Sequence, residues 1–465
     1  MQYTKFRITN YRGIDEAVVD LPAGEGSRVT TLIGLNESGK TTVLEAIYSF
    51  SPDPESRALY PETVLLSEDP SYYIPRREFS NFNGDITVEA VVVWEPKEKQ
   101  RTLAKLKQDT GIDLNPAGIP DRIKITSTST YKSSKKENRT NVWSISLYVR
   151  TGRQQKFRDP SVEEKRQIFS ALLGRLPAIA YFPTFVFQFP ERIYLKGGRN
   201  SPADRFYKKI FQAILDAGGE GHTIEEHIVG RYEQMRNQSP LDKVIDTAAM
   251  IMGARSAVEM IKQTVDKAAD TVSDVIIAKW DDIFRHSPLK KEISIEPFED
   301  YVNHIDGSGK QIVKHSVWVK FKVKDSGTRY NISDRSLGFR WFFCFLLFTR
   351  FMSQSRDGKG ILFLFDEPAS NLHAKAQEKL LESFSDISIA PNSLIFSTHS
   401  HYMVEPTWLE RAYVIKNDAI DYADVSGEQK RARGVRIEAI KYRDFVAQSD
   451  GSLGRMTYFQ RYLTD

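Results

Sequence analysis

The chain has 465 residues, of which 40% are hydrophobic and 27% charged, and its formal net charge is +4. This length exceeds one ordinary globular core, so two or three structural units, or one large domain with insertions, are expected. The longest apolar run, Trp341 to Phe348, is too short to cross a bilayer. The small net charge gives no argument for nucleic acid by itself.

The N-terminal sequence MQYTKFRITNYRGI lacks the continuous apolar segment of a secretory signal. Cys344 is the single cysteine, which excludes an intrachain disulfide. We therefore expect a cytoplasmic protein in a reducing compartment, with no membrane partner.

The first third of the chain begins with strand patterns. Tyr3, Phe6 and Ile8 predict one strand, residues 17–21 predict a second, and RVTTLIGL at 28–35 predicts a buried one. This buried strand leads directly into GLNESGKTT, after which the spacing of apolar residues becomes helical.

Residues 34–41 fit the phosphate-binding pattern G-x-x-x-x-G-K-[ST]. Backbone N–H groups of such a loop surround phosphate oxygens, Lys40 reaches the outer phosphates, and the Thr41 hydroxyl is a ligand for Mg²⁺. The sequence therefore predicts an ATP site with Mg²⁺. Its predicted nucleotide contacts are Asn36, Glu37, Ser38, Gly39, Lys40, Thr41 and Thr42.

The middle of the chain contains no such motif. We expect a strand at 85–94, helices at 162–176 and 204–218, a helical insertion of two or three long helices at 223–284, and strands at 291–298 and 315–323. Lys and Arg cluster between Arg122 and Arg158 in a Ser/Thr-rich context typical of hairpins or a loop. They form either a solvated basic face or a phosphate-contacting surface.

An acidic pair follows a second buried strand. ILFLFDEP at 361–368 would bring Asp366 to the Mg²⁺ ion, whereas Glu367, pointing elsewhere, would polarise the attacking water. Without the phosphate loop, the same residues would be an ordinary strand that ends in solvated acids.

Two further polar positions complete the pattern. His399 ends the apolar strand of SLIFSTHS and could contact the terminal phosphate, although an isolated histidine there would more often be structural. Ser336 and Gly338 lie at the start of the apolar helix of SLGFRWFFCFLLF. A helix N-terminus attracts phosphate, but a serine at this position is also an ordinary helix cap.

Together, ITNYRGI, GLNESGKTT, DRSLGFRW, LFDEPASNLHAKAQ and STHS resemble the ABC-type ATPases that include the SMC, RecF and OLD-like proteins. The DEPxxxLHxxxQ and RSxGFRWF forms resemble the OLD-like ATPases of anti-phage defence. The resemblance covers roughly 1 to 95 and 320 to 415. Among two-component systems, the layout is most similar to the PARIS ATPase subunit and next to the Septu ATPase.

The resemblance implies an α/β ABC-type ATPase head, a P-loop mixed sheet with an antiparallel sub-sheet and a long helical insertion. The implied lobes are 1–95 with the P-loop, 96–320 as the insertion, and 321–465 with the signature, the acidic strand and His399. Ser336 and Gly338 would bind the terminal phosphate of an ATP held by a second subunit, in head-to-tail dimers or a larger ring.

The implied function is slow ATP hydrolysis that controls a separate effector nuclease of Toprim type until a phage-encoded trigger is sensed. Little chain follows His399 in which to place a Toprim domain. Two alternatives stay open: a RecF/SMC-like repair ATPase that acts on DNA directly, and a structural scaffold that binds ATP with little turnover. Glu367 argues against the second alternative.

Some parts of the family pattern are absent or weak. The signature reads SLGFR rather than LSGGQ, and no glutamine is evident for the link between Mg²⁺ and the insertion, Gln188 being a candidate. Asn371 and His373 match the stretch that crosses the dimer interface in this family, so we expect interface contacts from them.

Overall fold

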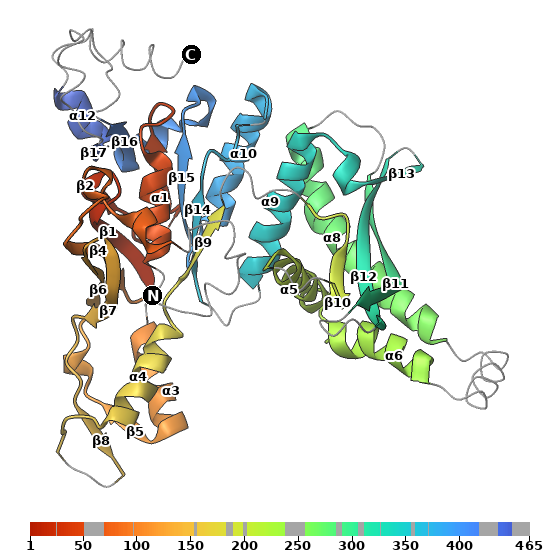
Figure 1. Ribbon diagram of the computed structural model, residues 1–465, viewed down its shortest axis with the longest axis horizontal. Coiled ribbons are helices and arrows are strands. Elements are labelled where there is room, and N and C mark those ends of the chain that lie inside the picture. Colours follow the sequence, from red (N-terminus) through yellow and green to blue (C-terminus); the bar gives the residue numbers. More distant parts are fainter. Residues whose placement is uncertain are drawn as a thin grey trace. The chain divides into compact units, whose positions relative to one another are not determined.

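The computed structural model divides into two compact units, each described here by itself (Figure 1). Unit 1 contains the described residues up to Phe182 and from 359 onward, and unit 2 those between 189 and 354. The structure describes residues 1–24, 26–50, 69–95, 97–152, 156–182, 189–198, 202–237, 256–284, 291–305, 311–325, 327–354, 359–370, 372–417 and 436–448.

The central sheet of unit 1 has the strand order β17-β16-β3-β15-β14-β9. Its strands are β3 (Val29–Ile33), β9 (Ala178–Phe182), β14 (Ile361–Phe365), β15 (Ser393–Thr398), β16 (Ala412–Asn417) and β17 (Ile437–Lys441). All pairs are parallel except β16 with β17. Every residue of β3, β9, β14 and β15 is buried, as expected where both faces of a parallel sheet are covered.

A second sheet of unit 1 is antiparallel, with the order β2-β1-β4-β6-β7. Its strands are β1 (Gln2–Tyr11), β2 (Ile14–Asp20), β4 (Gly84–Val93), β6 (Arg122–Lys132) and β7 (Lys135–Trp143). Helix α1 (Lys40–Ser49) contacts strands of both sheets. Tyr3 and Phe6 of β1 meet Phe50 at ring distances of 6.0 and 5.7 Å, so the end of α1 lies in the apolar core.

The remaining elements of unit 1 lie around these sheets. They are α3 (Glu98–Thr110), β5 (Ile112–Leu114), β8 (Val149–Thr151), α4 (Val162–Leu173), α10 (Ala374–Ile387), α12 (Tyr442–Gln448), and the short helices η2 (Pro70–Tyr73), η3 (Arg76–Glu78), η4 (Pro116–Gly118), η7 (His401–Met403) and η8 (Pro406–Arg411). Strands β5 and β8 pair with each other, beside α3 and α4 (Figure 1). Helix α4 begins at a capping box of Ser161 and Glu164.

Unit 2 combines an antiparallel sheet with helices. The strands are β10 (Ile193–Lys196), β11 (Glu292–Ile305), β12 (Gln311–Asp325) and β13 (Thr328–Asn331). The helices are α5 (Pro202–Ala217), η5 (Glu225–Val229), α6 (Gly230–Asn237), α8 (Ala257–Phe284), η6 (Ile332–Asp334) and α9 (Leu337–Gln354). Helices α5 and α8 contact α9, and α8 also contacts β11. The apolar side chains of α9 that the structure describes, from Phe339 to Phe351, are buried, Cys344 among them.

The predicted α/β class, with a P-loop sheet, a separate antiparallel sheet and helices in the middle of the chain, is confirmed. Of the helices predicted at 223–284, the described residues form one long helix, α8, and the shorter η5 and α6. In the described part of the chain, no helix is long and apolar enough to span a membrane.

The predicted lobes 1–95, 96–320 and 321–465 stay a prediction, and the compact units divide the chain elsewhere. Strand β9 lies within the predicted insertion but pairs with β14 at the edge of the P-loop sheet. Helix α9 lies within the predicted C-terminal lobe but belongs to unit 2. The motifs give no information on β9, because its sequence AIAYF is only an apolar run.

Arg139 links the antiparallel sheet to the end of α1. From β7, its guanidinium donates to the carbonyl of Ser49 at 2.7 Å and that of Phe50 at 3.4 Å, and its Nε donates to the Ser127 hydroxyl at 3.1 Å. The last carbonyls of a helix have no partner within the helix and carry partial negative charge. Arg139 therefore satisfies the C-terminus of the helix that begins at Lys40.

We expect Arg139→Met to lower the free energy of unfolding by about 1–2 kcal/mol, because hydrogen bonds from a charged donor to the end of α1 are lost. Methionine keeps much of the apolar stem, so the loss reports on the guanidinium. Urea denaturation of the protein, followed by the tryptophan fluorescence of unit 1, measures the free energy of unfolding. The variant Arg122→Met, at an exposed position of β6, is the matched control. Equal stability of the two variants would contradict the capping role.

Candidate functional site

The phosphate loop connects β3 to α1 in a conformation that its glycines permit. Gly39 has a φ of 103°, and a Cβ there would lie 2.6 Å from the Ile437 side chain. A Cβ on Gly34 would lie 2.6 Å from the Ile415 carbonyl oxygen. Glu37 also has a positive φ, of 65°, and its carbonyl accepts a hydrogen bond from the Asn417 amide of β16 at 3.2 Å. Strands β16 and β17 thus support the loop from outside.

Lys40 and Thr41 extend from the first turn of α1. Lys40 is buried, and its Nζ donates to the carbonyls of Gly34 and Leu35, both at 2.8 Å. The same Nζ lies 3.0 Å from Oε1 of Glu367. The Thr41 hydroxyl donates to Oδ2 of Asp366 at 2.7 Å. The two predicted motifs therefore meet, although 325 positions separate Thr41 from Asp366.

Asp366 is buried at the end of β14, with hydroxyl groups around its carboxylate. Ser397 of β15 donates to Oδ1 at 2.6 Å, and the Tyr181 hydroxyl of β9 lies 3.4 Å from Oδ2. Burial raises the pKa of the Asp366 carboxyl above its ordinary value, although the bonds from Ser397 and Thr41 oppose that rise. A cation beside the carboxylate would favour its ionised form.

Glu367 points away from Asp366 because its backbone is left-handed, with a φ of 47°. Its N–H donates to the Ser397 hydroxyl at 2.8 Å, which fixes this turn. Its Oε2 lies 2.8 Å from Nδ1 of His399. Burial acts to raise the pKa of Glu367, but His399 and Lys40 outweigh it and leave the pKa below its ordinary value. The ion pair with Glu367 raises the pKa of His399.

These residues fit a phosphate chain and a hard divalent cation. The Ser38 hydroxyl of the phosphate loop is fully buried and has no hydrogen-bond partner among the described residues. The Thr41 hydroxyl and the Asp366 carboxylate are oxygen ligands of the kind that Mg²⁺ takes beside phosphates and water. No group of three His, Cys, Asp or Glu side chains suited to a metal occurs in the described ranges, so a protein-only metal cage is not found there.

The other predicted nucleotide contacts differ in exposure. Asn36, Glu37 and Thr41 are exposed, and Thr42 is buried on α1. Ser336 and Gly338 belong to unit 2, so the cluster of unit 1 does not include them. Ser336 is exposed and caps α9, since its hydroxyl accepts from the Phe339 N–H at 3.3 Å.

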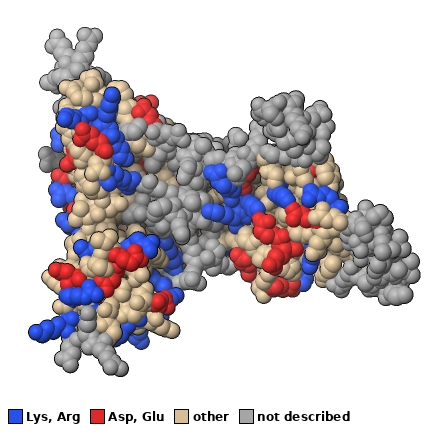
Figure 2. Space-filling view, turned by 60° about the horizontal axis from the view of Figure 1, so that its bottom comes forward, with Lys and Arg blue, Asp and Glu red and all other residues tan. Residues whose placement is uncertain are grey.

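Some of the described cations in the predicted basic segment pair with acids of unit 1. Lys124 lies 3.2 Å from Glu89, Arg150 2.7 Å from Asp113, and Arg158 2.7 Å from Glu164. Arg139 caps α1, as described above. On the face shown in Figure 2, blue and red side chains are interspersed over unit 1, at the left. These pairs favour the structural interpretation of the segment over a phosphate-contacting surface.

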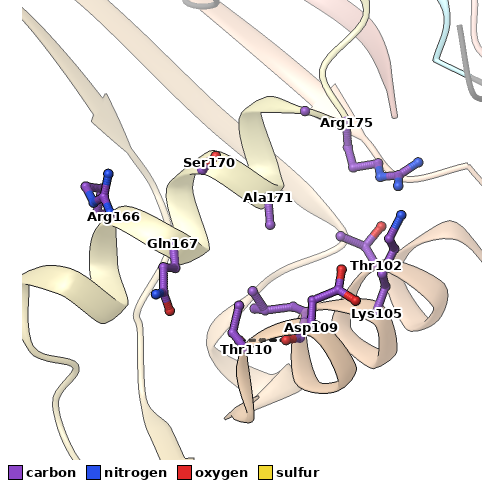
Figure 3. Close-up of a pocket in the computed structure, with 11 residues that line it drawn as sticks. Thr102, Lys105, Asp109, Thr110, Arg166, Gln167, Ser170, Ala171 and Arg175 are labelled. Carbon is purple, nitrogen blue, oxygen red and sulfur yellow. Dashed lines mark hydrogen bonds between the residues drawn. The ribbon is translucent and has the colours of Figure 1, made fainter.

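Two of the cavities in the described part of unit 1 bear on the site. One, of about 250 Å³, is next to the cluster and is lined in part by Glu367, His399, Gln377 and Ser400. The other, of about 410 Å³, lies between α3 and α4, and Figure 3 shows Lys105 and Arg175 at one end of it. Asp109 also lines the second cavity, so its mixed charges identify no ligand.

Several residues of the site were not predicted. Ser397 lies in β15, two positions before His399, and the period of two in the predicted strand SLIFSTHS would place both on one side. Asn417 and Tyr181 have no sequence signal.

His373 accepts from the Ala376 N–H at 3.2 Å and caps α10, whereas Gln188 and Asn371 lie outside the described residues. The predicted roles of His373, Gln188 and Asn371 stay predictions.

Comparison with known proteins gives one family and several similar structures. A family model described as AAA ATPase domain matches residues 1–170 and 201–404. The chain is similar to an SMC head bound to the C-winged helix domain of ScpA, at 10% identity and a TM-score of 0.46, over 96% of this chain and 100% of that one. No curated protein matches the chain.

Two more solved structures are similar at the same level. The Smc head domain with an extended coiled coil, bound to the C-terminal domain of ScpA and derived from Pyrococcus furiosus, has 11% identity and a TM-score of 0.44, over 96% of this chain and 98% of that one. The SMC head domain from Thermotoga maritima has 12% identity and a TM-score of 0.37, over 90% of this chain and 95% of that one. These scores are too low to bear on function. The family model covers most of the chain, and the chain therefore belongs to the AAA ATPase domain family.

Proposed function

We propose that the chain binds ATP with Mg²⁺ and hydrolyses it slowly, in composite ABC-type sites that two copies form head to tail. The observation that supports this most strongly is the meeting of two motifs: Thr41 bonds to Asp366 at 2.7 Å, and Glu367 lies within 3.0 Å of both Lys40 and His399. The family match supports an ATPase in general terms.

In this proposal Lys40 binds the outer phosphates, and Thr41 and Asp366 hold Mg²⁺. The ion, when bound, neutralises charge that develops on the phosphate oxygens. Glu367 is the general base: its pKa is below the ordinary value, so it is ionised at neutral pH and can take a proton from the attacking water. His399 orients Glu367 and contacts the terminal phosphate.

Ser336 and Gly338 act on the ATP of a partner subunit. The position of both residues at the start of α9, with Ser336 exposed and Gly338 half-buried, supports this role, because a helix N-terminus and its dipole favour an anion. A dimer, or a larger ring, is therefore the working form.

The finer role that we propose is control of a separate Toprim-type nuclease in a cytoplasmic two-component defence system of the PARIS or Septu kind, with release by a phage-encoded trigger. The resemblance of LFDEPASNLHAKAQ and DRSLGFRW to OLD-like ATPases supports it. A RecF/SMC-like ATPase that acts on DNA is equally compatible with the family. The internal ion pairs of the basic segment disfavour that alternative without excluding it.

We expect Glu367→Gln to slow hydrolysis by roughly 10² to 10⁴-fold, the usual contribution of a general base. ATP binding should persist or become tighter, because the variant frees Lys40 from its carboxylate partner. Steady-state phosphate release and equilibrium binding of a fluorescent ATP analogue measure the two effects, with exposed Glu378→Gln on α10 as the control. Unchanged turnover would remove Glu367 from this role.

We expect Ser336→Arg to abolish turnover, because the long side chain blocks the surface that meets the partner's ATP. Mixing it with Lys40→Ala chains, themselves inactive, should restore activity, since one composite site of the mixed dimer keeps both intact parts. Ser336→Ala, which loses only the helix cap at a cost of about 1 kcal/mol, is the control for stability. Failure of this complementation would argue against shared sites.

We expect a tagged chain, purified from cells that express its neighbouring genes, to retain a nuclease in a defined assembly whose mass depends on ATP. The Lys40→Ala chain is the control, because it should lose the ATP dependence. A lone dimer that retains DNA would support the repair alternative instead. An ATP-dependent assembly without turnover would support the scaffold alternative.

A further inference from the structure

Gln377 forms a bridge across the 250 Å³ cavity beside Glu367. It lies in the second turn of α10, half buried. Its Nε2 donates to the carbonyls of Ala369 at 3.2 Å and Leu372 at 2.8 Å, and its Oε1 accepts from the Ser400 hydroxyl at 2.6 Å. Both amide N–H groups and the carbonyl are thus used. The two carbonyl acceptors fix the orientation of the amide, because an oxygen could not replace Nε2 there.

The ends of this bridge adjoin the two members of the ion pair. Ala369 lies two residues after Glu367, in a turn in which the Ser370 N–H donates to the Glu367 carbonyl at 3.2 Å. Ser400 directly follows His399, and its own N–H donates to the Thr398 hydroxyl at 3.0 Å. A closed ring of contacts therefore runs through the two loops and returns by the 2.8 Å contact between His399 and Glu367.

The ring matters because the His399 side chain is the more exposed member of the ion pair. Its side chain is 41% exposed, whereas that of Glu367 is 17% exposed. Ser397 fixes the backbone of Glu367 from the strand side, but His399 lies beyond the end of β15. The bridge through Ser400 ties the segment after β15 to the loop after Glu367 by hydrogen bonds.

We propose that Gln377, acting through Ser400, is a positioning residue that holds His399 against Glu367 during ATP hydrolysis. This inference rests on the proposed function. It requires neither residue to touch the nucleotide. We expect the effect mainly in the turnover step, because most of the proposed phosphate contacts come from residues 36–42, which lie outside the ring.

The test uses variants that break the ring with little change in volume. Gln377→Glu places a carboxylate against two carbonyl oxygens, and Ser400→Ala removes the hydroxyl, whereas Ser400→Thr keeps it. We expect the first two to lower kcat about tenfold with an unchanged dissociation constant for ATP, and Ser400→Thr to retain kcat. Lys375→Gln, exposed on the same helix, is the control. A loss of ATP binding or of folding stability that parallels kcat would overturn the proposal.

A double-mutant cycle separates positioning from general damage. In a His399→Ala background, Gln377→Glu should cause no further loss of kcat, since its target is already absent. A further tenfold loss in that background would contradict the proposal.

Amide hydrogen exchange tests the bridge without turnover. We expect peptides that contain residues 399–403 to exchange faster in Gln377→Glu than in the unchanged chain. If the unchanged chain does not hydrolyse ATP, the proposed function fails, while faster exchange would still establish the bridge. Equal exchange in both chains would overturn the bridge itself.

Discussion

The site depends on the stabilisation of two adjacent carboxylates, of which Asp366 is buried and Glu367 is partly buried. Moving an ionised carboxylate out of water costs several kcal/mol, and Asp366 and Glu367 are neighbours in the chain. The left-handed backbone at Glu367 turns its carboxylate away from that of Asp366, which reduces the repulsion between the two. Hydroxyl groups surround Asp366, and cations surround Glu367. Ser397 serves both, donating to the first side chain and accepting from the backbone of the second.

Helix α1 connects this site to the rest of unit 1. Its first turn supplies Lys40 and Thr41, and its last turn ends at carbonyls that Arg139 satisfies from β7. Because α1 contacts both sheets, its position depends on both. A helix fixed at both ends cannot shift along its axis without breaking charged contacts at one of them. The antiparallel sheet therefore stabilises the geometry of the phosphate loop, although it contributes no side chain to the loop.

The sequence predicted the strands and side chains that short motifs encode, and it missed those that only the fold brings together. Lys40, Thr41, Asp366, Glu367 and His399 lie at fixed distances from glycines or from the ends of apolar runs, so local patterns identify them. Arg139 appears in the sequence as one more cation in a basic segment. Its role depends on a contact 90 residues away, which no local pattern contains. Gln377 stands in a quoted motif, yet its partners are two backbone carbonyls and the Ser400 hydroxyl, and no local pattern in the sequence indicates these contacts.

The position of Lys40 gives the site a property that follows from charge alone. Lys40 lies 3.0 Å from Glu367 and is one of the causes that lower the pKa of that carboxyl. In the proposed cycle a phosphate group competes with Glu367 for the same ammonium, so nucleotide binding would weaken this contact. Glu367 would then have His399 as its remaining close cation and would become a stronger base. Because that change accompanies binding, the Glu367 carboxylate would be least basic when the loop is empty and most basic when there is a water to activate. The position of His399 would then limit how basic the carboxylate becomes.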